Sequence, residues 1–267
     1  MMEGCPSGAC RARDKWILDA VASGRYAATF SEVISTHGGD EARFYVFSDA
    51  LKVDGVRVNV SAELQQQVAD LIGCLLLTPR VADLIWAQRE VTVQPHPRQI
   101  TSDTAAMVDH SQKIDAELAR MSGSPAGKLI CTVGKHWVID NDLLLHKGRA
   151  ENYGWHFDGP NFQGIKGEVT ATGLLDNDGV PVRLIQGRGW AHDMREVDYS
   201  QTCVLWSSTC LLNGRRAPVE ALLKDPRLAP LASHSGAMDI VRQPGVAPLQ
   251  AAIVLEPDLP DAEALQQ

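Results

Sequence analysis

The sequence lacks any apolar segment long enough to cross a bilayer as a helix. Its longest apolar stretch, LIGCLLL at 71–77, is far shorter than the roughly 20 residues that such a helix needs. The N-terminal residues also lack a basic start followed by an apolar run, which is the pattern of a secretory signal peptide. We therefore expect a cytoplasmic protein with no membrane partner.

Cysteine and clustered basic residues are scarce as well. Six cysteines are scattered over 267 residues, too few for a disulfide scaffold, so most of them should be buried thiols. The 25 basic and 33 acidic side chains give a net charge of −8 without a basic cluster, which argues against a nucleic-acid partner. Hydrophobic residues make up 45% and charged residues 22%, values typical of a folded globular protein.

Familiar catalytic signatures are missing too. There is no G-x-S-x-G elbow, no phosphate-binding loop with its lysine, no H-E-x-x-H and no dinucleotide-binding glycine pattern. These absences exclude the enzyme classes that are easiest to recognise, and no cofactor is predicted apart from the divalent metal considered below. The function must therefore be sought in individual residues.

Periodic patterns in the first half predict helices and one β-hairpin. Residues 50–60 alternate apolar and polar side chains around an Asp-Gly pair, which is typical of a tight hairpin turn. Capping residues followed by a 3.6-residue apolar period predict two helices, and apolar residues on one side predict a third. These helices begin at Ser61, at Thr78 and near 104, and the last ends at about 121. We therefore predict a helix-rich lobe over 1–121.

The second half has the patterns of a sheet. A Gly/Ser/Pro-rich break at 122–127 precedes segments with strand periodicity and Asn/Asp-Gly turns. These segments cover 129–140, 168–187 and 201–216. The expected fold class is α+β, with the helical N-terminal half packed on a mainly antiparallel β lobe over 128–245. Proline and acidic residues near the C-terminus predict a loose tail over 246–267.

Three segments of the predicted β lobe combine histidine with tryptophan. They are GKHW at 134–137, NYGWHF at 152–157 and the start of GWAHDMREVDYSQTC at 189–203. A tryptophan offers an apolar wall, and a histidine offers a group that titrates near neutral pH, which together suit a sugar or a peptide. We expect contacts to such a substrate from Lys135, His136, Trp155, His156 and Trp190. The alternative for each pair is a strand with one side chain in the core and its neighbour at the surface.

The segment 189–203 is the strongest candidate for catalysis. His192 could act as a general base oriented by Asp198, with Tyr199, Ser200 and Gln201 as polar contacts. The alternative is a polar loop held by its own hydrogen bonds between side chains and backbone. Both interpretations account for the density of polar groups.

A nucleophile or a metal ion could also use these residues. Cys203 could attack a substrate if His192 lowered its pKa, and Ser200 is an equally open candidate, although a small buried cysteine also fits the apolar TCVLW strand. His156, His192 and one carboxylate could instead hold a divalent metal such as zinc. The sequence does not choose between these mechanisms.

The segments VGKHWVIDND, NYGWHF, IQGRGWAHD and DYSQ resemble a family of uncharacterised bacterial proteins. The resemblance extends to FSDALKVDGVRVNVSAELQQQVAD in the first half, so it covers most of the chain. It implies a free-standing bacterial protein. No activity is assigned to that family, so it implies no catalytic residue.

Three functions follow from the residues alone. The first is a hydrolase for an amide or glycan-type substrate, with bacterial cell-wall peptidoglycan as the leading example and with Trp155 and Trp190 as substrate walls. The second is a non-catalytic protein that binds a carbohydrate or a protein partner, or serves in assembly, through the same aromatic residues. The third is a metal-dependent hydrolase. The expected partner is thus a polar small molecule, peptide or glycan, and nothing in the sequence indicates an oligomeric state.

Overall fold

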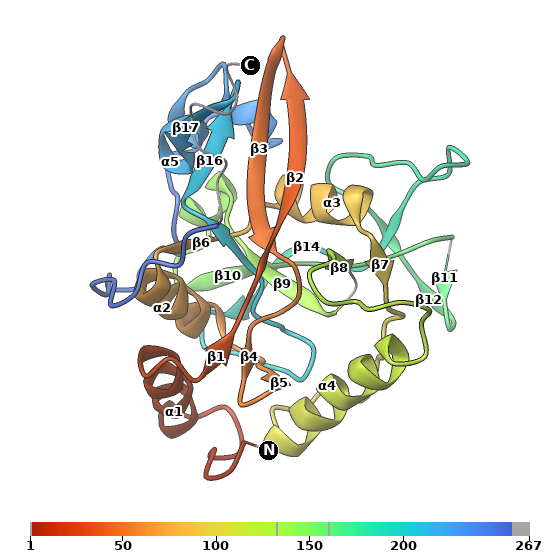
Figure 1. The fold of residues 1–267 in the computed structure, drawn as a ribbon, viewed down its shortest axis with the longest axis vertical. Coiled ribbons are helices and arrows are strands. Elements are labelled where there is room, and N and C mark those ends of the chain that lie inside the picture. The colour runs from red at the N-terminus through yellow and green to blue at the C-terminus, as the bar shows by residue number, and fades with distance from the viewer. Residues whose placement is uncertain (1, 132, 160, 258–267) are drawn as a thin grey trace.

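The computed structural model describes residues 2–131, 133–159 and 161–257. Two larger antiparallel sheets lie at the centre, and helices lie around them (Figure 1). This confirms the α+β fold class. None of the described helices is both long and apolar enough to cross a membrane.

Strands from both halves of the chain share the larger sheet. At its centre, β3 (Asp40–Phe47) pairs with β2 (Phe30–His37) along one edge. Its other edge pairs with β15 (Leu205–Ser207) and β16 (Thr209–Leu212), which are extended by β6 (Cys74–Leu76) and β17 (Arg215–Pro218). Hydrogen bonds between the N-terminal and C-terminal halves therefore run through this sheet. The first half also contains the β2–β3 hairpin, which the helix-rich prediction for 1–121 did not include.

The smaller sheet carries most of the histidine and tryptophan segments. Its strand order is β13 (Glu168–Val169), β14 (Arg183–Asp193), β10 (Arg149–Phe157) and β9 (Lys135–Val138). The pairing of β10 with β14 shifts register twice, between Ala150 and Gly154. Such bulges bend a strand and change the direction of its side chains. Here they determine which aromatic side chains of β10 face the core.

The hairpin predicted at 50–60 is confirmed. Strands β4 (Lys52–Val53) and β5 (Val56–Arg57) pair around a turn in which Asp54 and Gly55 have φ values of 48° and 81°. Two consecutive left-handed residues are what a type I′ hairpin turn requires. A short third strand, β1 (Tyr26–Ala27), pairs with β4.

The three predicted helices are present, and each begins with a side-chain cap. The caps are Ser61 for α2 (Ala62–Ile72), Thr78 for α3 (Pro79–Gln88) and Asp103 for α4 (Thr104–Leu118). The remaining elements are α1 (Arg11–Ala22), α5 (Val219–Lys224), the 3-10 helices η1 (Asn141–Leu144) and η2 (Ala229–Leu231), and the short strands β7 (Val91–Thr92), β8 (Ile130–Cys131), β11 (Asn161–Phe162) and β12 (Ile165–Lys166).

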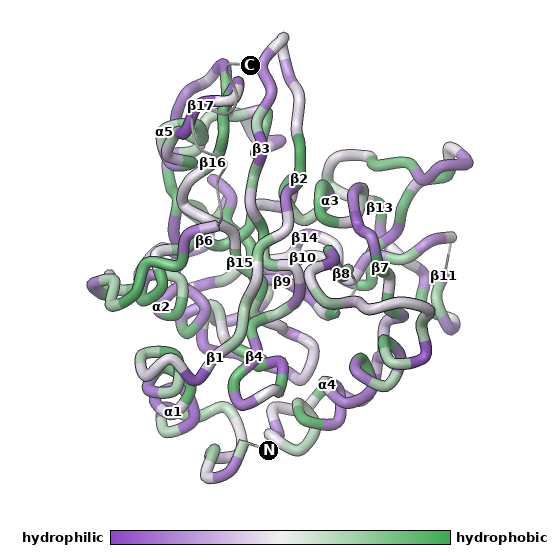
Figure 2. The backbone as a smooth tube through the Cα atoms, viewed as in Figure 1, coloured by the Kyte–Doolittle hydropathy of each residue, from purple (hydrophilic) through white to green (hydrophobic). Residues whose placement is uncertain are grey.

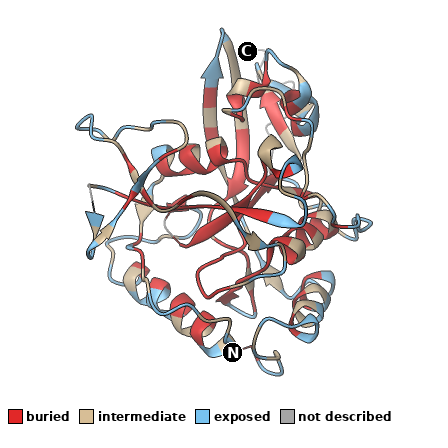
Figure 3. Cartoon of the chain, turned by 180° about the vertical axis from the view of Figure 1, so that it is seen from behind, coloured by how far each residue is buried: buried red, intermediate tan, exposed pale blue. Residues whose placement is uncertain are grey.

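The hydrophobic core lies between the two sheets and the helices. Trp86, Trp137 and Trp206 are among its largest buried side chains. The central strands are buried, whereas α1 and α4 each keep an exposed face (Figure 3). Hydrophilic and hydrophobic residues accordingly alternate along α4 (Figure 2), as expected for a helix with one face toward the core.

The described part of the predicted tail is docked on the fold. The backbone N–H groups of Ala252, Ile253 and Leu255 donate to the carbonyl oxygens of Leu71 and Ile72 at the end of α2. These bonds use carbonyl groups that a helix end leaves without partners in the helix. Residues 252–255 are therefore attached to α2, and residues 258–267 of the predicted tail lie outside the described residues.

Candidate functional site

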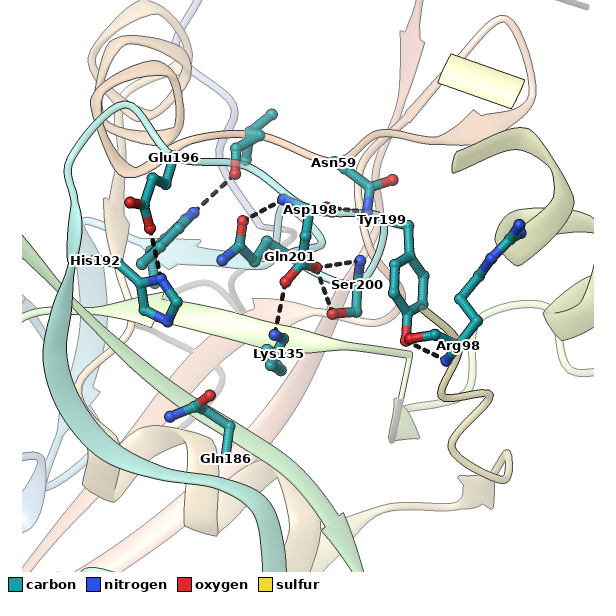
Figure 4. Close-up of polar contacts among 12 residues, drawn as sticks. Asn59, Arg98, Lys135, Gln186, His192, Glu196, Asp198, Tyr199, Ser200 and Gln201 are labelled. Carbon is teal, nitrogen blue, oxygen red and sulfur yellow. Dashed lines mark hydrogen bonds and ion pairs between the residues drawn. The ribbon is translucent and has the colours of Figure 1, made fainter. Parts of the chain in front are cut away.

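The segment 189–203 forms the end of β14 and a loop that returns beside β9. Asp193 begins the loop, since its carboxylate accepts a hydrogen bond from the backbone N–H of Arg195 at 3.0 Å. Further along, the Lys135 N–H donates to the Ser200 carbonyl oxygen at 2.7 Å. These bonds bring polar side chains of the loop, β9 and β14 together (Figure 4).

His192 pairs with Glu196. The Nδ1 atom of His192 lies 2.7 Å from an oxygen of Glu196, and both side chains are partly exposed, at 28% and 54%. The imidazole also packs edge-on against Trp137, with 5.7 Å between ring centroids. The predicted pairing of His192 with Asp198 is wrong, because the turn at Asp193 returns the chain within four residues and presents Glu196 to the ring.

Asp198 is instead the centre of a buried cluster. One of its oxygens lies 2.8 Å from Lys135 Nζ, and the other accepts hydrogen bonds from the N–H and hydroxyl of Ser200 at 2.7 and 2.6 Å. Burial raises the pKa of Asp198, but the charge and hydrogen bond of Lys135 and the bonds from Ser200 lower this pKa by more. Together these effects place the pKa of Asp198 below its usual value. The carboxylate therefore stays ionised and fixes the position of Lys135.

A cavity of about 570 Å³ adjoins both pairs. Its lining combines charged groups, carboxamides and the imidazole with the apolar side chains of Ala9, Ile100 and Val197. The polar members are Ser102, Lys135, Gln186, His192, Asp193, Arg195, Glu196, Asp198 and Gln201. This volume suits a small polar molecule or part of a longer chain. Of the predicted site residues, the cavity brings together Lys135, His192, Asp198 and Gln201.

The predicted aromatic walls are not part of this cavity. Trp155 is 2% exposed and has a φ of 61°, and its indole packs against His110 and Tyr199. The register shift at Gly154 directs this side chain toward the core. Trp190 stacks on His146 with 4.8 Å between ring centroids. The prediction that these two tryptophans enclose the substrate beside His192 is therefore wrong.

Tyr199 connects the loop to the backbone of Arg98. Its hydroxyl accepts a hydrogen bond from the backbone N–H of Arg98 at 2.6 Å and donates one to the Arg98 carbonyl oxygen at 3.2 Å (Figure 4). The phenol is buried, which raises its pKa. Tyr199 thus holds the segment before α4 against the loop, and it does not line the cavity.

His136 and His156 are buried outside the cavity. His156 Nε2 lies 2.8 Å from Asp83 Oδ1, and its ring stacks on Trp86. Asp83 also accepts hydrogen bonds from the Tyr153 hydroxyl and from Thr172. His136 is 5% exposed, and burial lowers its pKa to about 3, so its ring is neutral. Neither histidine can contact a substrate from this position without a rearrangement.

The fold also separates the histidines proposed for a metal. His156 pairs with Leu184 of β14, whereas His192 lies eight residues further along that strand, roughly 25 Å at the usual rise per residue. Among the residues that the structure describes, no group of three or more His, Cys, Asp or Glu side chains is placed to hold a metal ion. The geometry therefore does not bring the suggested metal ligands together.

The two candidate nucleophiles are enclosed. Cys203 has no exposed surface, and burial raises the pKa of its thiol, which disfavours the reactive thiolate. Ser200 is 1% exposed, and its hydroxyl donates to Asp198. Neither residue lines the cavity beside His192. A nucleophilic role for either side chain has no support from its surroundings.

Three relevant residues were missing from the sequence-based site. Glu196 follows His192 by four residues, and this spacing was a usable signal for a pair. Gln186 lies six residues before His192 on the same strand, but its direction depends on the register shifts of β10 and β14. Asp83 lies inside α3, and no local pattern links it to His156, which is 73 residues away.

No protein-family model, curated protein or solved structure matches the chain. The resemblance to uncharacterised bacterial proteins therefore stays a prediction.

Proposed function

We propose that the protein is a hydrolase whose substrate occupies the cavity beside His192. In this proposal His192 is the general base and Glu196 orients its ring, a role that the sequence analysis gave to Asp198. The base takes a proton from a water molecule as the water oxygen attacks the carbonyl carbon of an amide. The C–N bond then breaks, the proton passes from His192 to the leaving amine, and the products are a carboxylic acid and an amine.

Lys135 supplies positive charge to the same cavity. Its ammonium group has three donors, and Asp198 is its one described acceptor. The side chain lines the cavity, so its remaining donors can reach a substrate oxygen that becomes negative during the attack. Asp198 keeps the ammonium in place and remains ionised.

The observation that carries the proposal is the convergence of two different charge pairs on one cavity. The His192–Glu196 pair is partly exposed to solvent, whereas the Lys135–Asp198 pair is buried. A base beside a fixed cation is an arrangement that hydrolysis can use. A protein that merely binds the same ligand would require the cavity but not the His192–Glu196 pair.

The test is a hydrolysis screen with the wild type and matched variants. Peptide p-nitroanilides, p-nitrophenyl glycosides and soluble peptidoglycan fragments cover the amide and glycan classes. On any substrate that turns over, His192→Gln should lower kcat about 100-fold or more, the usual contribution of a general base. His37→Gln replaces an exposed histidine at the tip of the β2–β3 hairpin and serves as the control.

Glu196→Gln should lower kcat about tenfold, because the ring keeps a hydrogen-bond partner but loses the charge that stabilises its protonated form. Full activity of His192→Gln would refute the general-base role. Saturable binding of a substrate without turnover by the wild type would favour a binding protein.

A further inference from the structure

The cavity beside His192 continues into two neighbouring cavities. It shares Ile100 with a cavity of about 540 Å³ at the start of α4. It shares Ala9, Arg195 and Val197 with a cavity of about 360 Å³ beside α1. Because the cavity beside His192 has lining residues in common with each of the other two, it joins them into one continuous surface.

The segment 100–102 lines this surface and is attached to the loop that carries Tyr199. The Tyr199 N–H donates to the Thr101 carbonyl oxygen at 3.0 Å, and the Tyr199 hydroxyl holds Arg98. Within the described chain, the backbone N–H and C=O groups of Ile100 and Ser102 have no hydrogen-bond partner. Thr101 is bonded to the loop through its carbonyl oxygen, so the backbone groups of its two neighbours are the ones available to a pairing peptide.

Ile100 also presents an exposed apolar side chain. It is 77% exposed and lies where the central cavity meets the cavity at the start of α4. A hydrophobic side chain beside free backbone donors and acceptors is what an added β-strand uses, since the backbone gives affinity and the side chain gives selectivity. The segment thus has both parts of a peptide-docking edge.

The lining favours a peptide over a glycan. Of the described residues that line the three cavities, none carries a phenyl, phenol or indole ring. Sugars are commonly held by stacking on such rings, whereas an extended peptide needs an edge with which its backbone can pair. The two tryptophans expected to stack on a sugar lie outside this surface.

We propose that the substrate is an extended peptide that pairs with the backbone of Ile100 and Ser102 and places one of its amide bonds beside His192. This proposal rests on the hydrolytic function proposed above and narrows its substrate from amides and glycans to peptides. At about 3.3 Å per residue, an extended peptide of six residues is roughly 20 Å long, so it can contact the Ile100 edge and His192 at the same time only if it is longer than a dipeptide.

The experiment uses quenched fluorescent peptide libraries of two, four, six and eight residues with the full chain. We expect kcat/KM to rise at least about tenfold between two and six residues. Ile100→Glu should lower the ratio of octapeptide to dipeptide kcat/KM at least about fivefold. Leu145→Glu is the matched control, because Leu145 is 80% exposed and outside the three cavities. Circular dichroism checks that both variants are folded.

A second readout separates this proposal from the hydrolytic function. Binding of the fluorescein-labelled octapeptide pool is measured by polarisation, together with a pool in which the backbone amides are N-methylated. Suppose that the wild type cleaves no peptide. If it still binds the unmethylated pool at least about fivefold more tightly than it binds the methylated pool, and at least about fivefold more tightly than Ile100→Glu binds the unmethylated pool, then hydrolysis fails and the peptide edge stands. Equal cleavage at all lengths, or equal effects of Ile100→Glu and Leu145→Glu, would overturn the edge and leave hydrolysis intact. Turnover of peptidoglycan fragments without binding or cleavage of peptides would also overturn it.

Discussion

The protein contains two histidine–carboxylate pairs of nearly equal length in opposite surroundings. His156 and Asp83 are 2.8 Å apart with side chains 1% and 4% exposed. His192 and Glu196 are 2.7 Å apart with side chains 28% and 54% exposed. The first pair, which we call the sealed pair, is buried between β10 and α3, to which its two residues belong. The second, the open pair, adjoins the cavity.

The comparison shows that the residue types of a pair do not determine its role. Both oxygens of Asp83 accept hydrogen bonds, and their donors come from the neighbouring strand and from the loop after β13. Such a network joins elements of the fold and strongly favours one arrangement. The carboxylate of Glu196 has one hydrogen-bond partner among the described side chains, His192, which is four residues away. The pair therefore joins no distant elements of the fold, and its two side chains can contact a molecule in the cavity.

The largest expected effect comes from removing the sealed carboxylate. Asp83→Ala should lower the free energy of unfolding by about 3–5 kcal/mol, because several buried donors lose their acceptor at once. Glu196→Ala, the matched change in the open pair, should cost less than about 1 kcal/mol. Urea denaturation of both variants measures the difference. Similar losses in the two would show that burial does not distinguish the pairs.

The next effect concerns His136, which is buried beside the sealed pair. Burial lowers its pKa from the usual 6.5 to about 3. The unfolded chain therefore binds a proton at a pH where the folded protein does not. Above pH 6.5 neither state is protonated and the free energy of unfolding keeps its full value, whereas proton binding by the unfolded chain lowers it as the pH falls below 6.5. Between pH 6.5 and 4.5 the loss should be about 2–3 kcal/mol.

His136→Gln should flatten the dependence of stability on pH over that interval. Urea titrations of the wild type and the variant at the two pH values supply the measurement. A variant with the same slope as the wild type would assign the acid sensitivity to other groups, such as His110, whose pKa is also lowered by burial.

Glu151 sharpens the comparison because it is a buried carboxylate with one of its two oxygens in use. Oε1 pairs with Arg188, and Oε2 has no partner among the described residues. Burial raises the pKa of Glu151 from 4.5 to about 7, although the hydrogen bond and charge of Arg188 oppose this. Its stabilisation is therefore present below pH 4.5 and is lost as the pH rises through 7, opposite to His136.

Between pH 5.5 and 7 this loss should be about 2 kcal/mol in the wild type, and Glu151→Gln should remove it. The difference in unfolding free energy between the wild type and the variant, followed across this interval, is the measurement. The prediction fails if the wild type gains stability relative to the variant as the pH rises.

The smallest effect on stability is expected at the open pair. His192→Gln should change the free energy of unfolding by no more than about 0.5 kcal/mol, since the side chain is partly exposed and has one described polar partner. Thermal or urea unfolding can be measured on the same preparation used for activity. A loss of more than 2 kcal/mol would mean that the His192–Glu196 pair is structural, like the sealed pair.

Much of the local structure could be predicted from the sequence. The hairpin at 50–60, the helix caps at Ser61 and Thr78 and the Asn-Gly turn before β17 depend on neighbouring residues and are present in the fold. The β2–β3 hairpin had a comparable signal in its two glycines and in the alternating buried residues Ala42, Phe44 and Val46, but it was not included in the prediction.

The sequence predicted where the candidate site lies, but it did not predict which acidic side chain pairs with which basic one. The segment 189–203 does adjoin a cavity, and Lys135, His192, Asp198 and Gln201 line it. Which carboxylate meets which base was decided elsewhere, because β9 places Lys135 against Asp198 and thereby leaves Glu196 for His192. Charge pairing between segments 63 residues apart leaves no local pattern in a sequence.

The sequence by itself determined the fold class, the capped helices, the hairpin turns and the absence of a membrane-spanning helix from the described chain. These follow from interactions over a few residues, namely caps, turns and apolar periods. Only the tertiary structure decided that Trp155 packs in the core, that His156 belongs to Asp83 and that Ile100 remains exposed between two cavities. Burial and register depend on how distant strands pair, and a one-residue shift in β10 is enough to exchange the face on which a side chain lies.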